Sequence, residues 1–279
     1  MFIMMVQGKI EIWILPDNLR VASERAAHIL KNSKYEALFL DIRRELNDLV
    51  EDLALGAPYE HFIDEARRLN ILREPISSWE HQLKPILSAL GGLKIRSPCV
   101  KIFCYRSPRS EDSLIKRAEK IALLTLRINS TGKVDVKEWR ETIYDSISES
   151  ASYIDEAAEY ILRIYHEENL RGKSTIIISD FSGKNLLKRL RDAGISASLR
   201  YLLLPYYFTP LETLIRETAV MLRKGSDIGD ERIITLANLH ADYIRNYILT
   251  SSDYDEAYFR WIKDRVYGSS STASLPHIF

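Results

Sequence analysis

Five short apolar segments, each followed by a helical pattern, most constrain what this chain can fold into. Nearly continuous runs of β-branched and aromatic side chains are typical of strands buried on both faces of a sheet. Helical segments between successive strands favour parallel pairing. The sequence therefore predicts an α/β fold with a small, mostly parallel sheet, and its predicted strands cover residues 9–15, 35–42, 99–105, 174–179 and 197–204.

Helical patterns fill the long stretches between these strands. Residues 43–92 have a helical pattern interrupted by glycine and proline, and residues 111–170 have a longer one with a break near Asn129 to Gly132. These stretches predict long helical insertions in the sheet domain. We therefore predict an α/β domain over residues 1–210, a C-terminal helical extension over 211–267 and a flexible, Ser-rich tail over 268–279.

The composition argues against several classes of protein. The 39 basic residues equal the 39 acidic ones, so no global field steers the chain toward nucleic acid or an anionic membrane. No apolar run reaches the roughly 18 to 20 residues that span a bilayer, and the N-terminus lacks the pattern of a signal peptide, which predicts a cytoplasmic protein with no membrane contact. Cys99 and Cys104 should face opposite sides of a strand, so we expect no disulfide. The many Ile, Tyr, Arg, Lys and Glu residues resemble a thermophile-like composition.

Polar side chains follow the predicted strands. Because the carboxyl ends of parallel strands meet at one edge of a sheet, these side chains are expected to share a cleft. Carboxylate oxygens there can hold Mg²⁺ or Mn²⁺, and arginines can orient an anionic substrate. The alternative is that each Asp caps the following turn and each Arg pairs with an Asp. The candidate metal ligands are Asp17, Asp41 and Asp180, and the candidates for ligand binding are Asn18, Arg44, Arg106, Ser182 and Lys184.

The turn from Ser179 to Lys184 connects a predicted strand to a helix. Free N–H groups at such a turn can bind phosphate with Lys184 nearby, although Asp180 would repel an anion. The alternative is a tight turn that Ser182 caps. The chain contains no Walker or dinucleotide-binding glycine motif, no H-E-x-x-H and no G-x-S-x-G, so no residue is assigned a catalytic role.

Two further groups of residues indicate possible partners. Tyr254, Tyr258, Phe259 and Trp261 recur at helical spacing and predict a helix that docks on this chain or on a partner protein. The basic residues of segment 96–117 and of the helix after Ser182 allow a structural role in a nucleic-acid complex, and the alternative for them is a solvated helix face.

With its elements in this order, the chain resembles the TraB/ChaN/Tiki-like superfamily over about residues 9–207. That family has G-x-x-H after its first strand, where this chain has Leu15-Pro16-Asp17-Asn18. Its second strand ends in Glu with an Arg nearby, which corresponds to Asp41 and Arg44. An Ile-Asp-Arg ending corresponds to Cys104-Tyr105-Arg106, and a Gly-x-Gly-His turn corresponds to the turn from Ser179 to Gly183.

The resemblance implies a site that has lost its chemistry. The family includes metal-dependent peptidases and esterase-like hydrolases, but Asn18 and Ser182 stand where its histidines would be. Loss of both imidazoles removes metal ligands and proton-transfer groups together. We therefore expect a binding or regulatory subunit whose C-terminal helices engage a partner protein. The alternatives are a Mg²⁺- or Mn²⁺-dependent hydrolase and a structural subunit of a nucleic-acid complex.

Overall fold

The computed structural model describes residues 9–72 and 76–267, so the predicted tail over 268–279 lies outside the described residues. Five strands form one sheet in the order β3-β2-β4-β1-β5, and every neighbouring pair is parallel. This architecture confirms the predicted α/β fold. The strands are β1 (Ile10–Ile14), β2 (Ala37–Arg43), β3 (Lys101–Arg106), β4 (Thr175–Ser179) and β5 (Ala197–Tyr201).

The register places one row of apolar side chains straight across the sheet. Ile12 pairs with Ile177 on one side and with Leu199 on the other, while Phe39 pairs with Ile177 and Phe103. All five residues of β4 are buried, which explains why its sequence is continuously apolar apart from its terminal Thr and Ser.

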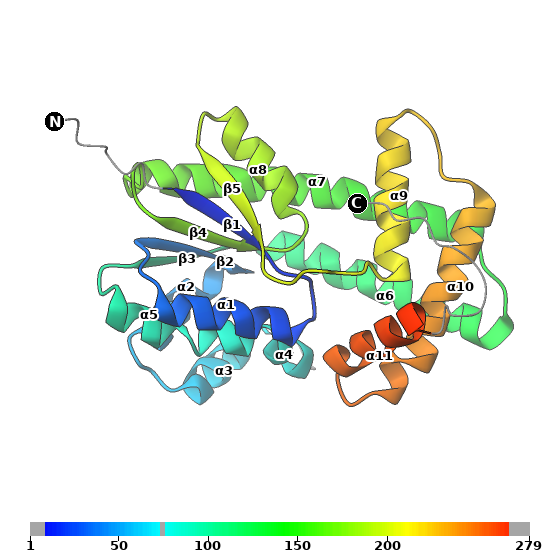
Figure 1. Cartoon of the computed structure of the whole chain (residues 1–279), viewed down its shortest axis with the longest axis horizontal. Helices are drawn as coiled ribbons and strands as arrows, with labels where there is room; N and C mark the ends of the chain where they lie inside the picture. Colours follow the sequence, from blue (N-terminus) through cyan, green and yellow to red (C-terminus); the bar gives the residue numbers. More distant parts are fainter. Residues whose placement is uncertain (1–8, 73–75, 268–279) are drawn as a thin grey trace. The chain divides into compact units, whose positions relative to one another are not determined.

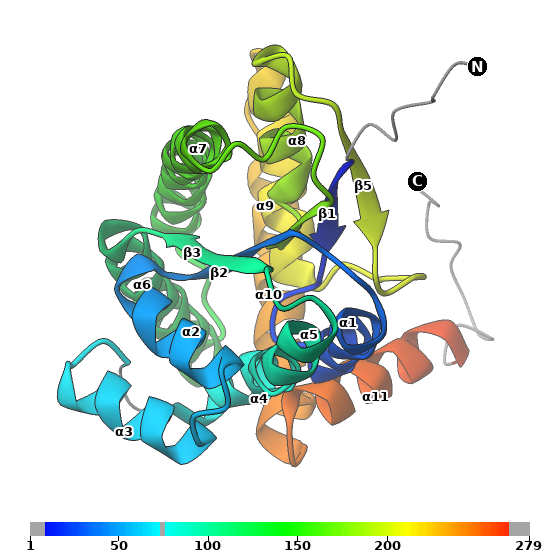
Figure 2. The same ribbon diagram turned by 90° about the vertical axis from the view of Figure 1, so that its left-hand side faces the viewer.

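Helices cover both faces of the sheet (Figures 1 and 2). One side carries the helices that follow β1 and β2, and the other carries α8 and the C-terminal part of α7. The second side packs Ala157, Ala158 and Ile161 of α7 and Leu186 of α8 into the main core cluster. The first side has α1 (Arg20–Asn32), η1 (Arg44–Leu46), α2 (Asn47–Ala54), α3 (Tyr59–Arg68), α4 (Ile76–Leu87) and α5 (Leu90–Arg96), and the later helices are α6 (Pro108–Thr131), α7 (Val136–Glu167) and α8 (Gly183–Asp192).

The chain divides into two compact units. Unit 1 contains the described residues up to 116 together with 148–206, and therefore the whole sheet. Unit 2 contains 117–147 together with the described residues from 207 onward. The sequence had assigned 117–147 to the sheet domain, but apolar side chains of this segment share a core with the C-terminal helices.

Unit 2 is entirely helical in the part that the structure describes. Its core joins Leu124 and Ile128 of α6 to Trp139 of α7, Leu214 of α9 and Leu236 of α10. No described helix of either unit is long and apolar enough to cross a membrane. The C-terminal elements are α9 (Pro210–Arg223), α10 (Asp230–Asn246), η2 (Ile248–Thr250) and α11 (Tyr254–Tyr267).

Candidate functional site

The carboxyl end of β2 is the point in the sheet that is best placed for a site. After β2 the chain turns to the face that carries α2, whereas after the neighbouring strand β4 it leads to α8 on the opposite face (Figure 1). In parallel sheets, ligands commonly bind at the carboxyl ends of strands that diverge in this way. The pairing of β2 with β3 is also irregular between Leu40 and Arg43, so a bulge falls within the segment of Asp41 and Ile42. A bulge of this kind redirects the side chains next to it.

Asp41 is the centre of a polar cluster at the carboxyl ends of β2, β3 and β4. Its Oδ1 accepts a hydrogen bond of 2.8 Å from Nε of Arg106 and a second from the hydroxyl of Tyr153 on α7. Asp41 is only 12% exposed, so the ion pair is well shielded from solvent. Burial and the charge of Asp41 raise the pKa of Tyr153 well above its ordinary value, so this hydroxyl remains a donor.

Asp180 lies close enough to Asp41 for the two charges to repel. Burial raises the pKa of the Asp180 carboxyl, and the charge of Asp41 adds to this effect. The N–H of Ser182, which donates to Oδ1 of Asp180 at 2.7 Å, and the charge of Arg106 act in the opposite direction. The cluster therefore contains two carboxyl groups with different partners, since Asp41 accepts from Arg106 and Tyr153 and Asp180 accepts from a backbone N–H.

The turn after β4 is stabilised differently from the predicted Ser182 cap. Ser182 occupies the N-cap position of α8, but its side chain makes no capping hydrogen bond. The carboxylate of Asp180 binds the Ser182 N–H instead, and the N–H of Gly183 donates to the Asp180 carbonyl at 3.0 Å. The N–H of Ser182 was a predicted donor to a phosphate, but in the structure it donates to Asp180.

Arg44 lies at the start of η1, directly after β2, and its guanidinium is held on three sides. Its Nε donates to the carbonyl of Tyr105 at 2.9 Å, and its Nη1 lies 3.3 Å from Oε1 of Glu156. Its Cζ lies 4.1 Å from the centroid of the Tyr160 ring. The remaining nitrogen, Nη2, is enclosed and has no hydrogen-bond partner among the described residues.

Glu156 links Arg44 to the end of β3. Its second oxygen, Oε2, accepts a hydrogen bond of 2.8 Å from the hydroxyl of Ser107, the residue after Arg106. The cluster thus contains two arginines, Arg44 and Arg106, and the carboxylates of Glu156 and Asp41 that pair with them.

The structure brings some of the predicted residues together and leaves others apart. Asp41, Arg106 and Asp180 interact, and Arg44 joins them through the residues at the end of β3. Asp17 and Asn18 are exposed in the turn after β1. Lys184 is exposed, and its Nζ lies 5.7 Å from the ring centroid of Tyr201 on β5.

The three predicted metal ligands do not form a metal site in the described part of the chain. No group of three or more His, Cys, Asp or Glu side chains among the described residues is arranged to hold a metal ion. Asp41 directs Oδ1 to Arg106 and Tyr153, and Asp180 directs Oδ1 to a backbone N–H. One oxygen of Asp41 and one of Asp180 therefore accept internal hydrogen bonds.

Three residues of the cluster come from α7 and were not predicted as site residues. Tyr153, Glu156 and Tyr160 are spaced three and four residues apart, which places them on one helix face. The signal available in the sequence was this polar and aromatic stripe within an otherwise apolar face that covers the sheet. They were missed because only residues that follow a strand were considered as site residues.

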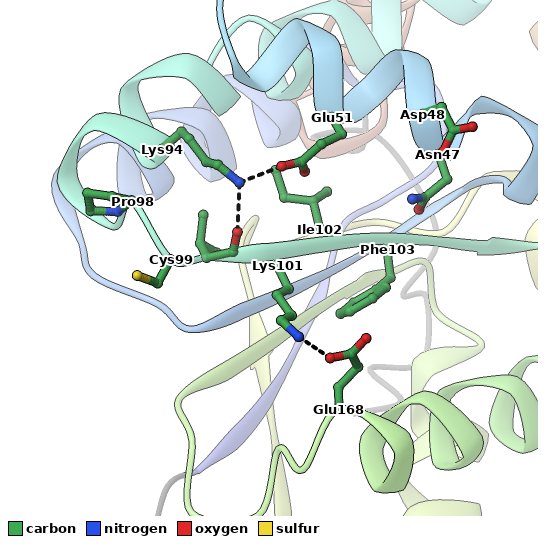
Figure 3. A pocket seen from close by; sticks show the side chains of 11 residues that line it. Asn47, Asp48, Glu51, Lys94, Pro98, Cys99, Lys101, Ile102, Phe103 and Glu168 are labelled. Carbon is green, nitrogen blue, oxygen red and sulfur yellow. Dashed lines mark hydrogen bonds and ion pairs between the residues drawn. The ribbon is translucent and has the colours of Figure 1, made fainter.

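A hollow of about 420 Å³ lies elsewhere, along the start of the edge strand β3 (Figure 3). Both of its lysines are already paired, since Lys94 binds Glu51 at 2.5 Å and Lys101 binds Glu168. The side chain of Asn47 accepts the N–H of Cys104 at 2.9 Å, and Lys94 also donates to the carbonyl of Val100. These contacts protect an exposed sheet edge, so we do not regard the hollow as the site.

Several basic residues considered for nucleic-acid binding have internal partners. Arg189 pairs with Asp155 at 2.6 Å, and Arg191 donates to the carbonyl of Ala197 at 3.0 Å. Arg117 donates to the carbonyl of Ser146. These three arginines therefore bind groups of the protein itself.

The aromatic stripe of α11 mostly packs inside unit 2. Tyr258 is 1% exposed and exchanges hydrogen bonds with the backbone of Tyr207, and Trp261 packs edge-on against Tyr243. Phe259, at 46% exposure, faces outward. The stripe therefore docks largely on this chain, which was one of the two expected outcomes.

The sequence shows no significant match to a family model or a curated protein, and its structure shows none to a solved structure.

Proposed function

We propose that the chain is a binding or regulatory protein whose unit 1 holds a small anion beside Arg44, and that it is not a hydrolase. One observation carries this proposal: Nη2 of Arg44 is enclosed without a hydrogen-bond partner in the described chain, while the rest of the guanidinium is fixed. A buried donor left unsatisfied costs about 1–3 kcal/mol. A carboxylate or phosphate oxygen would supply the missing acceptor, and arginine is the side chain best suited to bind either group.

The surroundings of Asp41 support binding over turnover. Oδ1 of Asp41 receives hydrogen bonds from Arg106 and from Tyr153, which fit an anchoring role better than that of a general base. Asn18 and Ser182 occupy the positions of the histidines in the TraB/ChaN/Tiki-like superfamily. In this proposal the chain is a degenerate relative of that family, as the sequence resemblance implies.

The proposal keeps two further expectations from the sequence. The first is a protein partner that contacts the C-terminal helices, where Phe259 offers an outward-facing aromatic ring. The second is a location in the cytoplasm.

Titration with acetate and with inorganic phosphate at constant ionic strength tests the proposal. In the wild-type protein we expect saturable shifts of the ¹⁵N NMR signals of the backbone amides around Arg44. Arg44→Lys keeps the charge but loses the planar fork, so its affinity should fall by roughly tenfold, which is about 1.4 kcal/mol.

Arg67→Lys is the matched control, because Arg67 is an exposed arginine of the same unit. It should bind like the wild type. If neither anion shifts these amides, the acceptor at Nη2 is solvent and the binding site does not exist. Hydrolysis of an ester or peptide substrate that is lost in Asp41→Asn would also overturn the proposal.

A further inference from the structure

Glu156 already presents a carboxylate to the proposed anion site. One of its oxygens lies 3.3 Å from Nη1 of Arg44, and the other accepts the hydroxyl of Ser107 at 2.8 Å. These contacts leave Nη2 of Arg44 without an acceptor, whereas an external carboxylate that replaced Glu156 could pair with Nη1 and Nη2 together. Glu156 therefore has the position and the chemistry of a ligand that is attached to the protein.

An incoming anion can reach Nη2 of Arg44 only after a side chain moves, because this nitrogen is enclosed. The carbonyl of Tyr105 belongs to β3, and Tyr160 packs against the main core, so neither is free to leave. The side chain of Glu156 is 41% exposed, so it can swing into solvent. Of the three groups that hold the guanidinium, Glu156 is the one that can be displaced.

We propose that Glu156 is a built-in competitor that occupies the anion site until a carboxylate ligand displaces it. This inference rests on the proposed function, since it names the ligand class and the regulation of the same site. Binding is then an exchange in which one carboxylate replaces another at Arg44, and the incoming one also supplies the acceptor that Nη2 lacks. The exchange lowers the apparent affinity and restricts the site to ligands that outcompete Glu156.

The charges around Arg44 favour a carboxylate over a phosphate as the ligand. With Glu156 in place, the two arginines are balanced by the carboxylates of Asp41 and Glu156. A monocarboxylate carries one negative charge, so it replaces the charge of Glu156 one for one. A phosphate group carries about −1.5 to −2 at neutral pH. Its excess charge would lie near Asp41, and Asp180 interacts with that residue.

The test compares Glu156→Ala, Glu156→Gln and Glu159→Ala in the full-length chain. Glu159 is an exposed glutamate one turn from Glu156 on the same helix, so its removal controls for a general loss of negative charge. Acetate and inorganic phosphate are titrated separately at constant ionic strength, with the backbone amides around Arg44 as the readout.

We expect Glu156→Ala to bind acetate at least about threefold more tightly than the wild type, the scale of a partly exposed ion pair. Glu156→Gln should lie between the two, because its amide oxygen still accepts hydrogen bonds without a charge. Glu159→Ala should match the wild type. Phosphate affinity should rise less than acetate affinity in Glu156→Ala.

The outcomes separate this inference from the proposed function. If the wild type binds acetate through Arg44 but Glu156→Ala binds it no better, Glu156 is not a competitor and the anion site still stands. If phosphate gains as much as acetate, the assignment to carboxylates is overturned. If no variant binds either anion while its spectrum remains that of a folded protein, both proposals fail.

Discussion

Gly183 is required by the packing of α8 on the sheet. A Cβ at this position would lie 2.5 Å from Cδ1 of Ile14, 3.0 Å from Cγ2 of Ile12 and 3.2 Å from Cβ of Ser179. Both isoleucines are buried, and β-branched side chains have few alternative rotamers. The absence of a side chain thus lets the first turn of α8 approach β1 and β4 closely, directly after Asp180.

We expect Gly183→Ala to lower the free energy of unfolding by about 1–3 kcal/mol, because it overpacks this contact. Gly91→Ala in α5 is the matched control, since the nearest atom to its added Cβ is the Ala54 carbonyl oxygen at 3.9 Å. Relief of the helix penalty of glycine should stabilise the control by up to about 1 kcal/mol. Urea unfolding of both variants gives the comparison, and equal effects at the two positions would contradict the packing argument.

Asp180 should make the stability of unit 1 depend on pH. Because burial and Asp41 raise its pKa in the folded state, the folded chain binds its proton more tightly than the unfolded chain does. Stability is therefore lost as the pH rises from below the ordinary Asp pKa of about 3.9 through the raised folded value. Asp180→Asn removes this titration and keeps an oxygen that can accept the Ser182 N–H.

The stability gain of Asp180→Asn over the wild type should therefore be larger at pH 7 than at pH 3.5. Asp192→Asn, at an exposed position at the end of α8, should show no such difference. Denaturant unfolding at the two pH values measures it. A gain for Asp180→Asn that is the same at both pH values would show that the carboxyl is not perturbed.

At the scale of elements, the local pattern predicted the strands well. The five predicted strands correspond to β1 to β5, with ends that differ by no more than three residues. Ile176 to Ile178 form a short apolar run between two helical patterns. A run of this kind is typical of a strand that is covered on both faces of a sheet. The order β3-β2-β4-β1-β5 depends on nonlocal pairing, so no local pattern contained it.

The same distinction explains which part of the candidate site was predictable. Asp41, Arg106 and Asp180 follow strands, and parallel strands bring their carboxyl ends to one edge. Glu156 and Tyr153 depend on which helix covers β2 and at what rotation, and this is decided by packing of the whole unit. The bulge within the segment of Asp41 and Ile42 was likewise hidden, since it arises from the pairing of β2 with β3.

At the scale of the molecule, the chain combines an α/β unit that contains the polar cluster around Asp41 and Arg44 with a helical unit that has its own core. The two proposals concern only residues of unit 1. Unit 2 provides the C-terminal helices that the sequence associates with a partner. This division separates the tests, since a change at Phe259 should affect partner binding and a change at Arg44 should affect anion binding.

Metal content decides between the binding protein and the hydrolase at this scale. The carboxylate of Asp41 binds Arg106 and Tyr153, and that of Asp180 binds a backbone N–H. We therefore expect untagged purified protein to contain much less than one equivalent of Mg²⁺ or Mn²⁺ by mass spectrometry. Asp41→Asn should give the same value. Stoichiometric metal that disappears in Asp41→Asn would mean that Asp41 exchanges Arg106 for a cation, and the alternative of a metal-dependent hydrolase would then replace the proposal made above.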